Sequence, residues 1–369
     1  MTLDFSTSGM TTGDRPYWVL LSMATGIGPV RFQRLLEVCG AARAAWEASD
    51  FEMAAAGLER RTADALHRLR RQLTPETAFA RLARLGIGAV TLLDPGYPSH
   101  LRQISDPPPV LFVKGQLAEA DQLAVALVGT RRATSYGRAV ADRLARDLAA
   151  AGVSVVSGLA RGVDTAAHRS ALEAGGRTLA VLGNGLDQVY PPENATLARR
   201  IIDQQQGALV SEFPPGVPPD AVNFPRRNRL ISGLSAATVI VEAGQRSGAL
   251  ITADFALEQG RDVFAVPGSI LSPVSVGPNT LLKQGATPAT SAQDILESLG
   301  GVPAPVAHSL PKLDGDETSV WEALSGEPRH IDELARALGK GAGEVSATLA
   351  VLELKGLARQ VGAMTYART

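Results

Sequence analysis

The chain has 369 residues, 36 of them basic and 37 acidic, which gives a formal net charge of −1 at neutral pH. The length exceeds what one ordinary hydrophobic core holds, so two or three domains are expected. The balanced charge excludes a basic field over the whole molecule, and any nucleic-acid site must be a local patch.

The sequence carries no signal for export, membrane insertion or metal binding. Residues 1–16 lack the basic flank and apolar run of a signal peptide, and no apolar stretch reaches membrane-spanning length. The single cysteine, Cys39, cannot form an internal disulfide, which fits a reducing compartment. The five histidines are scattered, without HxxxH, HExxH or CxxC spacing. We therefore predict a cytoplasmic protein with no membrane partner, no metal and no cofactor.

Residues 17–85 are predicted to form an all-helical domain of SAM or helix-hairpin-helix type. Gly26-Ile27-Gly28 leads into apolar residues at helical spacing. A turn of this kind is similar to the hairpin of helix-hairpin-helix modules, whose backbone N–H groups can meet a DNA phosphate. It also serves as a tight turn in small packing domains. The packing interpretation is preferred, because so short a motif recurs by chance.

Residues 86–298 are predicted to form an extended Rossmann-like domain of class α/β. An apolar run at 110–113 predicts a strand, and strands and helices then alternate. The later strands are continuously apolar, as expected for strands covered on both faces, and are predicted at 123–128, 153–156, 178–182, 208–210, 238–241 and 263–266. Helices are predicted between them, for example at 137–150, 165–174 and 250–259. This rhythm predicts a doubly wound parallel sheet.

The remaining residues are predicted to form a linker, 299–311, and a winged-helix domain, 312–369. The linker is rich in Gly, Pro and Ala. Helices at 320–324, 331–338 and 345–354 and a hairpin at 356–366 give the winged-helix order. The third helix and its flanks carry Glu344, Glu353 and Lys355, whereas a helix that faces phosphates should carry a positive excess. A protein contact or a structural role fits this domain better than groove binding.

Five polar loops directly follow predicted strands of the sheet. Strand C-termini in an open parallel sheet share one edge, and ligands bind in the crevice outside it. Glycines, free backbone N–H groups and arginines at such an edge suit anionic phosphates. The candidate DNA contacts in these loops are Gly129, Thr130, Arg131, Ser157, Gly158, Arg161, Asn184, Phe224, Arg226, Arg227, Asn228, Arg229, Gly244, Ser247 and Gly248. Arginines beside an aromatic, as at 224–229, are typical of single-strand binding.

No residue in these loops is predicted to be catalytic. Asp164 is expected to cap the following helix, His168 to be a hydrogen-bonded packing residue, and Glu242 to hold arginine side chains or loop N–H groups. Gly183-Asn184-Gly185 begins like a dinucleotide fingerprint, but Gln188 stands in place of the third glycine. Tyr190-Pro191-Pro192 then follows where that fingerprint needs a helix, and no GxxxxGK[ST] occurs. Dinucleotide and P-loop sites are therefore excluded.

Together these motifs resemble the DNA-processing protein A family (DprA, also called Smf) of bacteria, over about residues 90–290. The resemblance rests on Val128-Gly129-Thr130-Arg131, Ser157-Gly158-Leu159-Ala160-Arg161-Gly162-Val163-Asp164 with His168, Gly183-Asn184-Gly185-Leu186-Asp187 with Tyr190-Pro191, Ser211-Glu212-Phe213-Pro214-Pro215-Gly216, Asn223-Phe224-Pro225 with Arg227-Asn228-Arg229, Val241-Glu242-Ala243 with Ser247-Gly248, and Gly260-Arg261 with Val266-Pro267-Gly268.

The resemblance implies a dimer that binds single-stranded DNA through the Rossmann-like domain, shields incoming DNA and loads the RecA recombinase during natural transformation. It implies no catalytic activity. Carried onto this chain, it points to Arg131 and to the cluster of Arg227, Asn228 and Arg229. Pro192 stands where some members carry a lysine, which leaves a basic contact at that position in doubt.

Two other classes of function remain open on the same fold. Rossmann-like nucleotide phosphoribohydrolases carry a Pro-Gly-Gly loop followed by a catalytic glutamate. Here the corresponding loop is Ala243-Gly244-Gln245-Arg246-Ser247-Gly248, and the next helix has no glutamate before Glu258. A small-molecule sensor would show no dependence on DNA length. Turnover of nucleoside monophosphates and a DNA length series distinguish the three.

Overall fold

The computed structural model describes residues 12–300, 313–325, 328–355 and 357–368. These residues belong to two compact units, Met1–Pro305 and Val306–Thr369. Most of the predicted linker, from residue 301 onward, lies outside the described residues. No helix among the described residues is long and apolar enough to cross a membrane.

The first unit begins with a helical segment. Its α-helices are α1 (Arg15–Ser22), α2 (Pro29–Cys39), α3 (Ala42–Glu47), α4 (Asp50–Ala55), α5 (Arg60–Gln72) and α6 (Pro75–Arg84). Trp18 and Phe32 are fully buried between them, with ring centroids 4.9 Å apart. Their hydrophobic core is continuous with that of the sheet. The domain boundaries predicted at 85/86 and 298/299 stay predictions.

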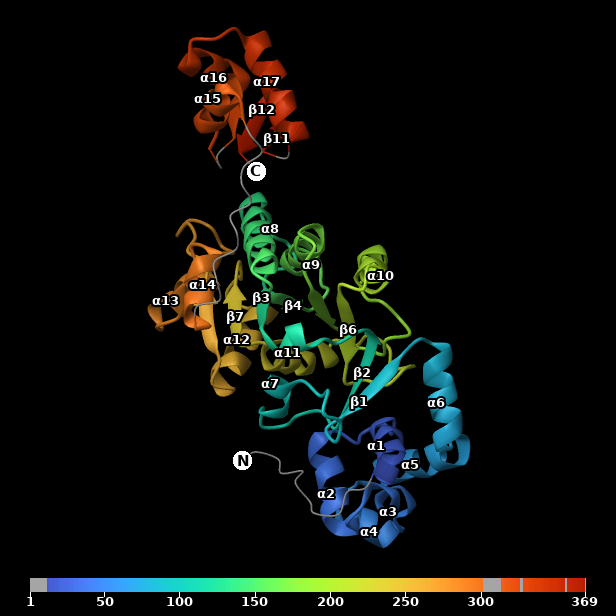
Figure 1. Ribbon diagram of the computed structural model, residues 1–369. Helices are drawn as coiled ribbons and strands as arrows, with labels where there is room; N and C mark the ends of the chain where they lie inside the picture. The colour runs from blue at the N-terminus through green and yellow to red at the C-terminus, as the bar shows by residue number, and fades with distance from the viewer. Residues whose placement is uncertain (1–11, 301–312, 326–327, 356, 369) are drawn as a thin grey trace. The chain divides into compact units, whose positions relative to one another are not determined.

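A nine-stranded sheet follows within residues 12–300, in the order β1-β2-β6-β5-β4-β3-β7-β8-β9 (Figure 1). Its strands are β1 (Gly88–Thr91), β2 (Val110–Gly115), β3 (Ala124–Val128), β4 (Ser154–Ser157), β5 (Thr178–Val181), β6 (Gly207–Ser211), β7 (Ala237–Ile240), β8 (Asp262–Ala265) and β9 (Thr287–Pro288). Neighbours from β6 through to β9 pair in parallel, whereas β1 and β2 add an antiparallel edge. The predicted α/β class with a doubly wound sheet is confirmed.

Helices cover both faces of this sheet. They are α7 (Ser99–Arg102), α8 (Ser135–Ala150), α9 (Val163–Glu173), α10 (Ala195–Asp203), α11 (Asn223–Gly233), α12 (Gly248–Glu258), α13 (Val276–Lys283) and α14 (Ala292–Ser298). Val125 and Leu127 of β3 pack in one core cluster with α8 and α9, whereas Ala124 and Ala126 belong to the cluster that holds α11 and α12. Alternate residues of a strand thus serve opposite faces, which explains why the predicted strands are continuously apolar.

The direction of winding reverses at β3. The chain runs from β3 through β4 and β5 to β6 on one side, then returns to β7 and continues through β8 to β9 on the other. Such a switch point opens a crevice outside the carboxyl ends of the two central strands. Here those strands are β3 and β7, and the loops that follow them carry Arg131 and Glu242.

The second unit has the predicted winged-helix order. It contains α15 (Gly315–Ala323), α16 (Ile331–Leu338) and α17 (Ala342–Leu354), with the strands β10 (Arg329–His330), β11 (Ala358–Gly362) and β12 (Thr365–Arg368). Leu334 and Leu349 are fully buried in its own core. Lys355 pairs with the buried carboxylate of Glu317, so this lysine stabilises the unit internally. The predicted hairpin is confirmed, although residue 356 lies outside the described residues.

Candidate functional site

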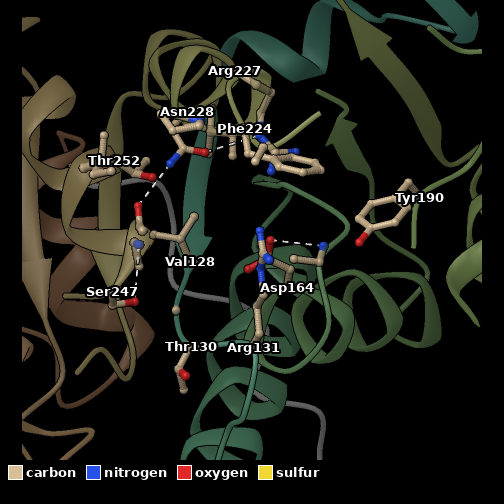
Figure 2. Close-up of a pocket in the computed structure, with 18 of the residues that line it drawn as sticks. Val128, Thr130, Arg131, Asp164, Tyr190, Phe224, Arg227, Asn228, Ser247 and Thr252 are labelled. Carbon is tan, nitrogen blue, oxygen red and sulfur yellow. Dashed lines mark hydrogen bonds between the residues drawn. The ribbon is translucent and has the colours of Figure 1, made fainter. Parts of the chain in front are cut away.

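A cavity of about 670 Å³ lies at the switch point, outside the carboxyl ends of β3 and β7, and the loop that follows β4 also lines it (Figure 2). Eight of the predicted contacts line it: Gly129, Thr130, Arg131, Phe224, Arg227, Asn228, Ser247 and Gly248. Further lining residues that the sequence did not single out include Tyr190, Pro219, Ile251 and Thr252. Loops more than 100 residues apart in the sequence therefore converge on one surface, as the sheet topology predicts.

The ring of Phe224 is surrounded by arginines and a second aromatic ring. The guanidinium carbons of Arg131 and Arg227 lie 5.4 Å and 6.0 Å from its centroid. The ring of Tyr190 lies 5.6 Å away, tilted by 30°. Tyr190 is 36 % exposed, so part of its ring is accessible from solvent. The sequence analysis named Tyr190 only as part of a motif and not as a candidate contact. Its position in the loop after β5 indicates that it lies at the ligand edge of the sheet.

The loop from β3 to α8 is held by Glu242, at the end of β7. The Thr130 N–H donates to the Glu242 carbonyl oxygen at 2.7 Å. The Thr134 N–H and hydroxyl donate to the Glu242 carboxylate at 2.9 Å and 2.5 Å. Thr134 also accepts a hydrogen bond from the Gly137 N–H and so caps α8. The expected role of Glu242, holding loop N–H groups, is confirmed, and the residue is only 2 % exposed.

Arg227 enters the sheet edge from α11 and is buried. Its guanidinium donates to the carbonyl oxygens of Gly158, at 2.8 Å, and of Val181. A Cβ on Gly158 would come within 2.6 Å of that guanidinium, so only glycine leaves room for it. Burial lowers the pKa of Arg227 to about 10, and the side chain remains charged at neutral pH. Arg227 thus places a positive charge close to the ring of Phe224 at neutral pH.

Asp164 does not cap its helix, which corrects the sequence-based expectation. The N-cap of α9 is Gly162, without a side-chain hydrogen bond. Asp164 lies inside the first turn, and its carboxylate accepts the N–H groups of Gly158 and Ala160 at 3.1 Å and 3.3 Å. Burial raises the pKa of Asp164, and the nearby Arg227 opposes that rise. The carboxylate therefore shapes the β4–α9 loop rather than the helix end.

His168 is a fully buried packing residue, as expected. Its Nε2 accepts the Leu159 N–H at 3.3 Å, so the neutral ring carries its proton on Nδ1. That Nδ1 lies 2.6 Å from the hydroxyl oxygen of Thr178, which in turn donates to the Val155 carbonyl. Burial, followed by the charge of Arg227, lowers the pKa of His168 to about 3.

Two of the three arginines that were predicted as DNA contacts at 226–229, Arg227 and Arg229, are buried in the core. Arg229 is 5 % exposed and pairs with Glu212 and, at 3.3 Å, with Asp106. The cause is helical geometry: α11 packs along the sheet, so each turn directs some of its side chains inward. Arg226 stays exposed, with its guanidinium carbon 5.9 Å from the ring of Phe213.

Other predicted contacts serve the loops themselves. Ser157 and Asn184, 0 % and 1 % exposed, donate to backbone carbonyls of Leu127 and of Gly185 and Gln188. Both side chains are buried in this structure, and their role as DNA contacts stays a prediction. Arg161 is exposed but pairs with Glu193. Asn228 lines the cavity while bonding to the Gly248 carbonyl at 3.0 Å; Gly244 lies outside the lining.

A second hollow, of about 340 Å³, adjoins the cavity at Arg131. It is lined by five arginines and one glutamate, with smaller residues between them: Arg131, Arg132, Arg138, Arg161, Arg169 and Glu193. Among the described residues, no group of three or more His, Cys, Asp or Glu side chains could hold a metal ion. The surface at the switch point is therefore basic and partly aromatic.

Residues 88–300 match the protein family described as DNA recombination-mediator protein A. The chain belongs to this family. Residues 303–364 match the DprA winged helix domain. Protein Smf of Escherichia coli K12 is 44 % identical over 276 residues, covering 70 % of this chain and 72 % of that protein. Protein Smf of Synechocystis is 33 % identical over 399 residues, covering 97 % and 100 %.

Solved structures of DNA processing protein A from two bacteria share the fold of this chain. The X-ray structure of DNA processing protein A from Streptococcus pneumoniae matches with a TM-score of 0.64 and 36 % identity, covering 78 % of this chain and 98 % of that one. DNA processing protein A from Helicobacter pylori, solved for its single-stranded DNA binding mode, matches with a TM-score of 0.51 and 31 % identity, covering 57 % and 95 %. The family resemblance inferred from the motifs is confirmed.

Proposed function

We propose that this protein binds single-stranded DNA in the cavity at the switch point. The observation that carries the proposal is the position of Phe224, a half-buried ring beside Arg131, Arg227 and Tyr190. An aromatic face accepts any base by stacking, and the exposed Arg131 beside it can hold an adjoining phosphate. The single-strand binding mode of the related Helicobacter pylori protein supports the proposal.

The proposed stacking of a base on Phe224 predicts a preference for single-stranded over duplex DNA. A base must be unstacked, and in a duplex also unpaired, before it can stack on Phe224. The free-energy cost of exposing the base is therefore a few kcal/mol lower in a single strand than in a duplex. The other contacts that we propose, through Arg131 and the arginines of the adjoining hollow, go to phosphates and carry no sequence information. Binding should therefore be tolerant of sequence and should weaken as salt releases bound counterions.

The side chains that could do chemistry here are already engaged, which supports binding without turnover. The Glu242 carboxylate accepts two hydrogen bonds from Thr134. The Asp164 carboxylate accepts two loop N–H groups, and His168 is buried and neutral. Incubation with nucleoside monophosphates should release no ribose phosphate; release would favour a phosphoribohydrolase instead.

We also propose the cellular role that family membership suggests: a cytoplasmic homodimer that shields incoming single strands and loads RecA onto them during natural transformation. Light scattering tests the dimer. RecA ATPase activity on single strands coated with a single-strand binding protein tests loading, because ATPase activity should rise when this protein is added. An unchanged RecA rate would contradict loading but not DNA binding.

The binding proposal is tested by titrating fluorescent single-stranded and blunt duplex oligonucleotides over a range of salt concentrations. Phe224→Ala should weaken single-strand binding by about 1–3 kcal/mol, the usual worth of one stacked base. Phe224→Trp should retain it, and Phe51→Ala, an 83 % exposed aromatic in the helical segment, is the matched control. Equal affinity for the duplex, or no effect of Phe224→Ala, would contradict the site.

A further inference from the structure

A third hollow lies in the helical segment, away from the cavity at the switch point. It has a volume of about 470 Å³ and lies between the α1–α2 turn and α5. Its lining includes Gly26 of the turn and Arg31, Arg61 and Arg68 from the helices, with Glu59 as its carboxylate. Arginines thus outnumber acidic groups by three to one in a hollow to which the proposed function assigns no role.

The arginines of this hollow differ in their ion pairs among the described residues. Arg31 donates to the Gly26 carbonyl at 3.0 Å and pairs with Glu59 at 2.6 Å, so its charge is compensated. Arg61 and Arg68 are exposed and form no ion pair within the described part of the chain. They are seven residues apart on α5, which is close to two full turns and places them on one face of the helix. The hollow therefore offers two arginines that form no ion pair among the described residues, about 10 Å apart along the axis of α5.

The turn beside this hollow lies close to Arg226, which is adjacent in sequence to two residues that line the main cavity. A Cβ on Gly28, the N-cap of α2, would lie 3.6 Å from a terminal nitrogen of Arg226. Arg226 stands between Pro225 and Arg227, both of which line the main cavity. Arg81 of α6 donates to the Pro215 carbonyl at 3.2 Å, which holds the helical segment against the same rim. The exposed Arg226 thus lies between the cavity and the third hollow.

We propose that the third hollow binds the phosphate backbone of the same DNA strand after it leaves the cavity across Arg226. The inference rests on the proposed function and extends its site into the helical segment. None of the residues that line the hollow is aromatic, so it offers no platform for a base and would contact phosphates alone. Its contribution should be independent of sequence and should appear only with strands long enough to reach it.

The test compares an oligonucleotide of about 6 nucleotides, which fills the cavity alone, with one of about 30, well beyond a typical single-strand site. Arg61→Ala/Arg68→Ala should weaken binding of the long strand about tenfold or more and leave the short strand unchanged. Because each single-strand phosphate contact contributes about 0.7 to the slope of log K against log salt, the long-strand slope should fall by about 1.4. Arg61→Lys/Arg68→Lys keeps both charges and should retain most of the affinity.

The matched control is Arg146→Ala/Arg199→Ala, which removes two exposed arginines of α8 and α10 that line none of the three hollows described here. It should bind both strands as the wild type does, and thermal melting checks that all variants fold. Wild-type affinity of Arg61→Ala/Arg68→Ala for the long strand would overturn the inference. If the wild-type protein binds neither strand, the proposed function itself fails, so the two failures are distinguishable.

Discussion

Single residues in the arginine-rich loops have different roles despite similar sequence surroundings. Arg131 is exposed and lies over the ring of Phe224. Arg229, from the equally basic run at 226–229, is buried against Glu212 and Asp106. A buried ion pair is costly to break on one side, because the remaining charge loses its partner. The first arginine is therefore available to a ligand, and the second belongs to the fold.

This difference predicts opposite outcomes for two alanine substitutions. Arg131→Ala should weaken single-strand binding by about 1.5–3 kcal/mol, the worth of a charged hydrogen bond, without changing the melting temperature. Arg229→Ala should lower the free energy of unfolding by about 3–5 kcal/mol. DNA titration and urea unfolding of both variants check this. If the Arg229→Ala variant were as stable as the wild type but bound DNA poorly, Arg229 would be a DNA contact and not a structural residue.

His168 gives a prediction for the pH dependence of stability. Its pKa is about 3 in the folded protein and near 6.5 when unfolded, so the unfolded chain binds one more proton between these values. The free energy of unfolding should therefore fall as pH drops below 6.5, by up to about 1.4 kcal/mol per pH unit. The raised pKa of Asp164 acts in the opposite direction.

Comparison with His168→Gln isolates this contribution, because glutamine offers a donor and an acceptor but does not titrate. Urea unfolding at pH 7 and pH 5 should show a loss in the wild type that exceeds the loss in the variant by about 2 kcal/mol. Equal losses would mean that the histidine is accessible to protons in the folded state.

At the scale of elements, the β3–α8 loop is defined by its attachment to β7. Hydrogen bonds from Thr130 and Thr134 to Glu242 fasten the loop at both ends. A Cβ on Gly137 would come within 2.1 Å of the Glu242 carboxylate, so α8 begins directly against that side chain. Arg131 lies between the two attachments and depends on them for its position.

Glu242→Ala should therefore weaken DNA binding through Arg131, by about tenfold, or 1.4 kcal/mol. In the Arg131→Ala background the same change should add little, because the two residues act as a unit. A double-mutant cycle of binding free energies measures this coupling, with Glu258→Ala, on the exposed side of α12, as the control. Strictly additive losses would show that Glu242 acts independently of the arginine.

At the scale of the whole molecule, the chain combines two units with different chemistry. The unit up to Pro305 carries the arginine-lined hollows. In the unit from Val306 onward, Lys340 pairs with Asp316 and Lys355 with Glu317, so both charges are used internally. Glu344 and Glu353, at either end of α17, add negative charge that would repel a phosphate backbone.

Deleting residues 312–369 should consequently leave single-strand affinity within about threefold of the full chain. Each unit has its own hydrophobic core, so the remaining unit should stay folded, which circular dichroism checks. The titration on the truncated protein is the discriminating measurement. A loss of about tenfold or more, 1.4 kcal/mol, would place the winged-helix unit in the DNA site.

The sequence by itself determined the elements and the ligand edge. Continuous apolar runs predicted the parallel strands, and glycines and arginines directly after them predicted a phosphate-binding edge, because both signals depend on local spacing. Loops at the carboxyl ends of parallel strands meet at one edge of the sheet whatever the exact side-chain geometry. Arg131, Phe224 and Ser247 could therefore be assigned to one surface from the sequence.

Only the tertiary structure decided which members of those loops face the cavity. Arg226, Arg227 and Arg229 are nearly adjacent in sequence, yet one is exposed, one lies beneath the aromatic ring and one is paired in the core. Their roles depend on the rotation of α11 about its axis and on partners from other elements, such as Glu212 in the loop after β6 and Asp106. Because those contacts join residues from separate elements of the chain, the sequence around each residue does not indicate them.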